Sequence, residues 1–151
     1  MCRLLRFFEI HIELGPATRR DFNILSSLMG SLCISLTSPA TLQHLKFNIS
    51  FDGSDKYFNH DAFYEDLHDA EVWRHLDSIT SHPIGSRLQR VDINIDYEFG
   101  YYNNPDEDIV LEAVLDSLPL LRAKGILFVE TAWGGCCAKY APSATGRDLV
   151  L

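Results

Sequence analysis

An apolar frame of eight residues recurs along this chain and constrains what it can fold into. Residues 88–95 read Leu-Gln-Arg-Val-Asp-Ile-Asn-Ile, in which apolar and polar residues alternate after the first three positions. This alternation, with its β-branched residues, is typical of a half-buried strand. Residues 42–49 are the best copy, residues 5–12 keep the apolar positions, and residues 121–128 form a weaker copy with Lys124 at an apolar position. The sequence therefore predicts a strand unit repeated three or four times.

A helix is predicted after the first strand. Thr18 is a suitable N-cap, and Asp21 is placed to complete a short capping box with it. Apolar residues then follow at steps of three and four as far as residue 36. The proline at position 39 ends the pattern, since the residue before proline avoids the helical conformation.

Two further helices are predicted after the second and third strands. Within residues 61–80 the apolar residues after Leu67 recur at steps of three only, so a bend or a tightened turn is expected between Asp69 and Trp73. The third helix is predicted to begin at Asn104 as N-cap, with Pro105 in the first turn, and to end near Gly125. A short last strand is expected at residues 126–129.

Strand and helix thus alternate along residues 1–130, which predicts an α/β fold with parallel strands and right-handed crossovers. The recurrent frame favours a solenoid of leucine-rich-repeat type over an ordinary open α/β layer. The spacing between frames is uneven and longer than the roughly 20–29 residues usual for leucine-rich repeats. Residues 131–151 lose the periodicity, and we expect a poorly ordered tail there.

Composition limits the kinds of partner. The chain has 151 residues, the size of one domain, and its net charge is −8. This charge argues against nucleic acid and against an anionic membrane surface, because both require clustered Lys and Arg. The four cysteines form no C-x-x-C motif, so reduced thiols and a cytoplasmic or nuclear location are expected, without a metal or cofactor.

Parallel strands would bring the polar residues of the frames into rows on one face of the sheet. We expect this face either to be a solvated surface with compatible charges or to be the recognition surface that solenoids present to a protein partner. The three predicted rows are Glu9, Lys46, Asp92 and Gly125, then His11, Asn48, Asn94 and Leu127, then Glu13, Ser50, Asp96 and Val129.

Other groupings of reactive residues are weaker. Asp92, Asn94 and Asp96 offer too few oxygen ligands for calcium, which usually takes roughly six to eight. His68, Glu71 and His75 could share a helix face, but their spacing matches no zinc motif and a solvated face is favoured. The sequence contains no catalytic motif of a nucleotide-binding or hydrolase fold. The aromatic group formed by Tyr97, Phe99, Tyr101 and Tyr102 is either edge packing or an anchor for a partner.

Four segments, residues 36–45, 73–78, 88–93 and 118–127, resemble in the same order the C-terminal part of fungal F-box proteins of the mushroom type. That part is a degenerate leucine-rich-repeat-like region, and the resemblance covers about residues 5–130. It implies an α/β solenoid and, in full-length members, an adaptor that hands substrates to a ubiquitin ligase. The F-box itself would lie upstream of this chain, so contact with the ligase core is expected only if an F-box is present there.

The expected function is therefore non-catalytic recognition of a protein partner. One alternative is a small α/β enzyme with its site at the carboxyl ends of the strands, where open parallel sheets bind ligands. The candidate residues for that site are Asp52, Asp55, Glu98 and Asn103. Another alternative is a truncated product without an independent role, because the first strand candidate begins almost at the first residue and end repeats normally need caps.

Overall fold

A computed structural model describes residues 5–15, 17–35, 42–52, 59–82, 87–98, 104–133, 136–143 and 149–150. Strands and helices alternate through most of the chain, as the frames predict. The elements are β1 (Phe7–Leu14), α1 (Arg19–Ser35), β2 (His44–Asp52), α2 (His60–His68), α3 (Ala70–Asp77), the 3-10 helix η1 (Ser78–Ser81), β3 (Arg90–Glu98), α4 (Glu107–Asp116), α5 (Pro119–Ala123), β4 (Leu127–Trp133), β5 (Cys136–Ala141) and β6 (Leu149–Val150).

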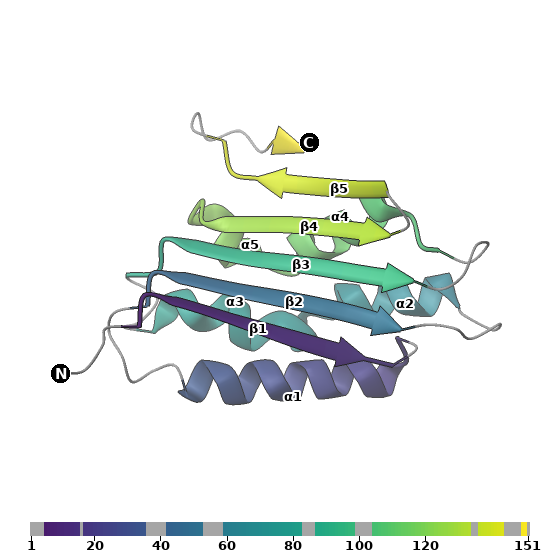
Figure 1. Ribbon diagram of the computed structural model, residues 1–151, viewed down its shortest axis with the longest axis horizontal. Helices are drawn as coiled ribbons and strands as arrows, with labels where there is room; N and C mark the ends of the chain where they lie inside the picture. The colour runs from purple at the N-terminus through teal and green to yellow at the C-terminus, as the bar shows by residue number, and fades with distance from the viewer. Residues whose placement is uncertain are drawn as a thin grey trace.

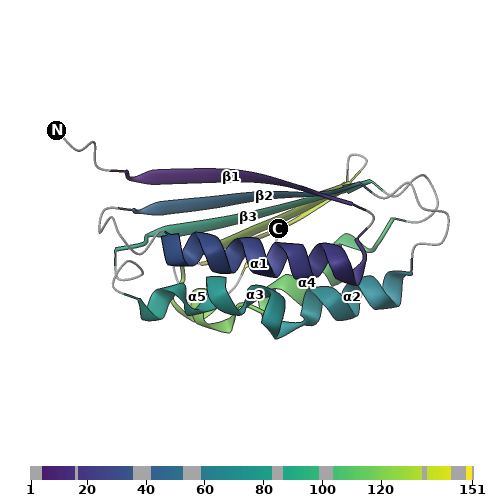
Figure 2. The same ribbon diagram turned by 90° about the horizontal axis from the view of Figure 1, so that it is seen from below.

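The strands form one sheet in chain order, from β1 at one edge to β6 at the other (Figure 1). The first four strands run parallel, while β5 pairs antiparallel with β4 and β6 pairs antiparallel with β5. Figure 2 shows that the helices lie together on one side of the sheet. The predicted α/β class with parallel strands is confirmed for β1 to β4, and the described elements form two layers in which every described helix lies on the same face of the sheet.

The hydrophobic core lies between the sheet and the helix layer. Alternate residues of β2 and β3 point into it, as the frames predict for half-buried strands. Trp73 of α3 is fully buried there, and its indole N–H donates to the Leu67 carbonyl oxygen at 2.8 Å. The strand residues in this layer are Leu45, Phe47, Ile49 and Phe51 of β2 and Val91, Ile93, Ile95 and Tyr97 of β3.

Two local predictions about the helices are confirmed. The Thr18 backbone N–H donates to the Asp21 carboxylate at 2.9 Å, which is the bond from Asp21 back to the cap that the predicted box requires, while the Thr18 hydroxyl donates to the same carboxylate. The long second helix breaks at Asp69, inside the interval where a bend is predicted. Asp69 ends α2 and its carboxylate accepts the N–H of Glu71 at 2.9 Å, so one residue serves as C-cap and as N-cap.

The predicted start of the third helix is wrong by two residues. The N-cap of α4 is Asp106, not Asn104, and its carboxylate accepts the N–H groups of Asp108 and Ile109. Pro105 therefore precedes the cap. The predicted single helix is also divided, because α4 ends at Asp116 and α5 is a separate short helix. The predicted stop is correct for α5, since Gly125 has a φ of 71°, the left-handed conformation that follows many helix ends.

The predicted irregular tail is also wrong in part. β4 extends to Trp133, and β5 follows it as an antiparallel strand. Ala138 and Tyr140 of β5 are buried against the helix layer, but two apolar positions make too short an alternation to identify a strand from sequence. Residues 144–148 and 151 lie outside the described residues.

Among the described residues, no helix has both the length and the apolar character needed to cross a bilayer.

Candidate functional site

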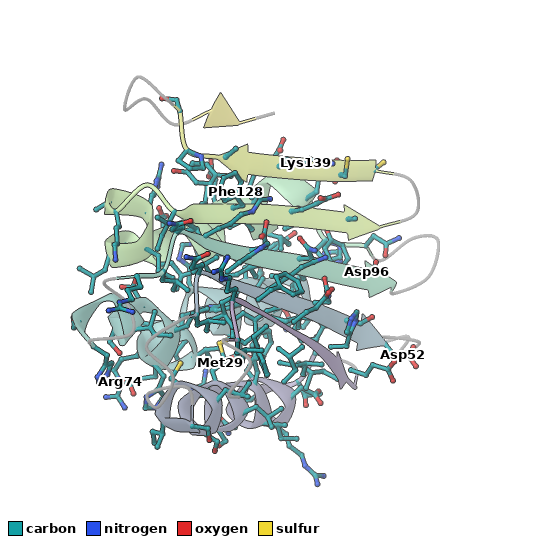
Figure 3. The ribbon with its side chains drawn as sticks, turned by 60° about the vertical axis from the view of Figure 1, so that its left-hand side comes forward. Met29, Asp52, Arg74, Asp96, Phe128 and Lys139 are labelled. Atoms are coloured by element: carbon teal, nitrogen blue, oxygen red, sulfur yellow. The ribbon has the colours of Figure 1, made fainter. Side chains whose placement is uncertain are left out.

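The sheet face opposite the helices carries the polar residues of the frames, and we call it the open face. It consists of alternate residues of β1 to β5, those whose neighbours in each strand point into the core. Figure 3 shows three of its labelled side chains, Asp96 on β3, Phe128 on β4 and Lys139 on β5, and also Met29 of α1 on the helix side of the sheet. Because no described helix covers this face, its side chains are available to a large molecule.

The register confirms most of the predicted rows. Glu9, Lys46 and Asp92 lie side by side, as do His11, Asn48 and Asn94, and likewise Glu13, Ser50 and Asp96. The fourth strand is shifted from the prediction by three residues. Phe128, Glu130 and Ala132 occupy the positions expected for Gly125, Leu127 and Val129. The error arose because Leu121, taken as the first leucine of a frame, belongs to α5.

A group of interacting side chains lies on the open face at the amino end of β3. The Arg90 guanidinium donates two hydrogen bonds to the Asp92 carboxylate, both at 2.8 Å. His44 on β2 contacts the same carboxylate through Nε2. The Arg90 guanidinium carbon also lies 4.0 Å from the centre of the Phe128 ring, and Phe7 of β1 packs edge-on against the His44 imidazole with ring centres 4.7 Å apart. The group links four strands.

Asp92 is the electrostatic centre of that group. It is only 8% exposed although it lies on the open face, because Arg90 and His44 cover it. Burial raises the pKa of the Asp92 carboxyl, but the hydrogen bonds from Arg90 and His44 outweigh burial and hold the pKa below its ordinary value. Asp92 is therefore a charged residue of the folded structure rather than a free contact group.

A second network occupies the middle of the face. Glu9 accepts from Lys46 Nζ at 3.1 Å and from Asn48 Nδ2 at 2.6 Å. Asn94 Nδ2 donates to Asn48 Oδ1 at 2.8 Å, which continues the chain of bonds to β3. The hydrogen bonds from Lys46 and Asn48 lower the pKa of the Glu9 carboxyl. Predicted site residues on three separate strands, Glu9, His11, Lys46, Asn48 and Asn94, are thus brought into one network, whereas Asp92 and Asp96 are not part of it.

The carboxyl end of the face is different. The side chains of Glu13 and Asp96 are exposed, and neither side chain makes a hydrogen bond or an ion pair within the described part of the chain. They flank Ser50 in a hollow of about 320 Å³, which His11, Asn48 and Asn94 also line. The hollow presents two carboxylates, a hydroxyl and two amides to solvent, so it is suited to hydrogen-bond donors and cations.

The described residues do not bring together the candidate enzyme site or the candidate histidine site. Asp52 and Glu98 are register partners at the ends of β2 and β3, whereas Asp55 and Asn103, the other two residues of the enzyme alternative, lie outside the described residues. His68 is separated from Glu71 and His75 by the helix break at Asp69, and Glu71 pairs with Arg74 at 3.3 Å.

Metal-binding and redox groupings do not form where the chain is described. No cluster of three or more histidine, cysteine or acidic side chains within metal-binding reach occurs among the described residues. Cys136 and Cys137 are exposed free thiols, and as consecutive residues of a strand they point to opposite faces. Burial raises the pKa of the Cys33 thiol to about 11, which keeps it protonated.

Tyr97 belongs to the core rather than to an aromatic anchor. It is 1% exposed, and its hydroxyl donates to the Pro105 carbonyl oxygen at 3.4 Å. The other three aromatic residues of that predicted group, Phe99, Tyr101 and Tyr102, lie outside the described residues.

Sequence reasoning missed the residues that hold the amino end and the far side of the face. Phe7, His44 and Arg90 form the row before Glu9, Lys46 and Asp92, and extending the predicted register by two residues would have found them. The ion pair between Lys139 and Glu130, at 3.2 Å, could not have been found, since β5 was not predicted.

No family model matches the chain, and comparison with curated proteins and with solved structures also gives no match.

Proposed function

We propose that this chain is a non-catalytic protein-recognition module and that its partner binds on the open face. The observation that supports this most strongly is the alignment of polar side chains from three strands on a sheet face that no described helix covers. Hydrogen bonds hold Glu9, Asn48 and Asn94 in fixed positions before any partner arrives, and Asn48 and Asn94 line the hollow between Glu13 and Asp96. A preorganised surface of this kind loses less conformational entropy on binding than a flexible one.

The charges indicate the chemistry of the partner. Carboxylates at the amino end and in the middle of the face are paired with Arg90 and Lys46. Glu13 and Asp96 at the carboxyl end are exposed, and they make no ion pair in the described chain. With a net charge of −8, the chain attracts basic surfaces. The proposed contact is therefore a Lys- or Arg-bearing segment of the partner, seated between Glu13 and Asp96.

We also propose that the fold is a solenoid fragment rather than an ordinary open α/β layer. The recurrent frame and the parallel register of β1 to β4 support a solenoid of leucine-rich-repeat type. The resemblance to fungal F-box proteins supports the role of a substrate-binding part of a ubiquitin-ligase adaptor, acting in the cytoplasm or the nucleus. Contact with the ligase core would then depend on an F-box encoded together with this chain.

A charge-reversal experiment tests the proposal. The face variant combines Glu13→Lys with Asp96→Lys. The control variant combines Glu65→Lys on α2 with Glu112→Lys on α4, two exposed residues of the helix layer. Both variants change the net charge from −8 to −4, because each replaces two acidic residues with two lysines. A difference between them therefore reports the location of the charge rather than its amount.

Proteins cross-linked to the wild-type chain in extracts of its own source would be identified by mass spectrometry. We expect the control variant to retain them and the face variant to lose them, with unchanged far-UV circular dichroism for both. Equal capture by the two variants, or no specific capture by the wild-type chain, would contradict the proposal.

A further inference from the structure

The edge of the sheet at β1 is less well covered than the interior strands. The first leucine of the frame is 41% exposed at Leu5, but only 0% at Leu42 and 2% at Leu88. The two following core positions of β1, Phe8 and Ile10, are partly exposed, whereas their register partners Leu45 and Phe47 are fully buried. The apolar row therefore continues past β1 without a neighbour among the described residues.

The helix beside this edge, α1, also has apolar side chains exposed on one flank. Ser26 and Gly30 mark the flank of α1 that faces α3, because Ser26 bonds the Glu71 carbonyl and Gly30 lies against the His75 ring. At 100° per residue, Ile24 and Leu28 lie on the opposite flank. They are 42% and 39% exposed and line a shallow depression of about 350 Å³.

The backbone of β1 offers hydrogen bonds in the same direction. The Arg6 carbonyl accepts from Gln43 and His44, so it points toward β2. Since successive residues of a strand point their N–H and C=O groups to opposite sides, those of Glu9, His11 and Glu13 point away from the sheet. β1 is the first strand of the sheet order, which leaves these groups without a strand partner in the described chain. Such an edge is a template for a further strand.

We propose that β1 accepts an additional strand from a protein partner, and that this segment alternates apolar and basic residues. Its backbone pairs with the outward N–H and C=O groups of Glu9, His11 and Glu13. Its apolar side chains then cover Phe8 and Ile10 and reach the Ile24 and Leu28 flank, while its basic side chains lie on the open face beside Glu13. The added strand would have the exposed Glu13 carboxylate on one face and the apolar flank of Ile24 and Leu28 on the other. A segment that alternates apolar and basic residues matches both faces. This inference concerns the edge of the sheet and does not depend on a partner binding across the open face.

The test uses the full chain and three acetylated peptides of eight residues, the length of β1. The first alternates valine and lysine, the second alternates valine and glutamate, and the third has the composition of the first with its valines and lysines in separate blocks. Amide hydrogen exchange followed by NMR gives the protection of each backbone N–H. We expect the alternating valine–lysine peptide to slow exchange at Glu9, His11 and Glu13 at least tenfold, with little change at Ile10 and Ile12.

Three variants locate the contact. Ile24→Asn and Leu28→Asn should each weaken binding of the first peptide by about tenfold, the loss expected when a half-exposed apolar contact is removed. Ile109→Asn is the matched control, since Ile109 of α4 is 43% exposed but lies away from β1, and it should leave binding unchanged. Neither the valine–glutamate peptide nor the block peptide should protect the outward amides.

Three results would overturn the inference. Equal effects of the alternating and block peptides would show attraction by charge alone, and uniform protection of even and odd residues in β1 would show general stabilisation. Protection of the outward amides without peptide, together with a dimer in sedimentation equilibrium, would show that a second copy of the chain occupies the edge.

Discussion

The two ends of the open face have similar acidic residues in different settings. At the amino end, Asp92 is 8% exposed and held by Arg90 and His44. At the carboxyl end of the same strand, four residues further on, the Asp96 side chain is exposed and makes no hydrogen bond or ion pair in the described chain. One strand therefore carries a carboxylate that holds the sheet together and another that is available to a partner.

This difference separates stability from recognition on a single surface. A charged group that already has its partners contributes to folding and has little left to offer a ligand. An exposed carboxylate contributes little to folding, and its interaction with a partner forms only on binding. Substitutions at the two ends should therefore affect different measurements.

The largest expected effect is from Asp92→Ala. It removes the acceptor of two guanidinium hydrogen bonds and leaves Arg90 and His44 side by side. The free energy of unfolding, measured by urea denaturation at pH 7, should fall by about 2–3 kcal/mol. Arg90→Lys is a graded control, because lysine keeps the charge but loses the paired donors. An effect of Asp92→Ala below about 0.5 kcal/mol, the range of ordinary surface changes, would remove the distinction between the two ends.

The second effect is a dependence of stability on pH. The pKa of Asp92 is lowered in the folded chain, so the unfolded chain binds more protons at acid pH. The stabilisation is present above the pKa of an unfolded aspartate, about 3.9, and is lost as the pH falls through the lower pKa of the folded state. Asp92→Asn should flatten the stability curve in this acid range. If the curves of unfolding free energy against pH were parallel for wild type and Asp92→Asn, the lowered pKa of Asp92 in the folded chain would be contradicted.

Much of this comparison could be anticipated from the sequence. The alternation in three frames gave the strands, and identical spacing within each frame gave the register that brings Asp92, Lys46 and Glu9 together. The sequence could not distinguish Asp92 from Asp96, because both alternate identically with apolar residues. The register places Arg90 and His44 in the row before Asp92, but that both side chains bond the Asp92 carboxylate follows only from the three-dimensional structure.

The fourth and fifth strands were harder to predict for another reason. Leu121 fits an apolar frame, but it also fits the helical periodicity of α5, and short apolar runs do not distinguish the two. β5 contributes only Ala138 and Tyr140 to the core, too few positions to reveal a period of two. Residues such as Phe128 and Lys139 were therefore assigned to the face only by the structure.

A smaller effect is expected in the middle of the face. Asn94→Ala removes one hydrogen bond, the one that Asn94 donates to Asn48 at 2.8 Å. The unfolding free energy should fall by about 1 kcal/mol, and Asn48 should become more mobile in NMR relaxation. Asn48→Ala would be compared with it, since Asn48 also donates to Glu9. No loss in either variant would show that the network is not formed in solution.

The smallest effect on stability is expected at the carboxyl end. Glu13→Gln and Asp96→Asn, separately or together, should change the unfolding free energy by no more than about 0.5 kcal/mol. The same changes should reduce the salt dependence of binding to a basic partner, because they remove the charges that attract it. A marked loss of stability from either change would show that these carboxylates have structural partners after all.

The most direct test of the open face as a recognition surface is site-specific photocross-linking. A benzophenone amino acid would replace Ser50, between Glu13 and Asp96, or Glu112 on the exposed helix side. We expect the partner to form a covalent adduct at position 50, Glu13→Lys with Asp96→Lys to abolish that adduct, and no adduct to form at position 112. An adduct at position 112 but not at position 50 would contradict this expectation.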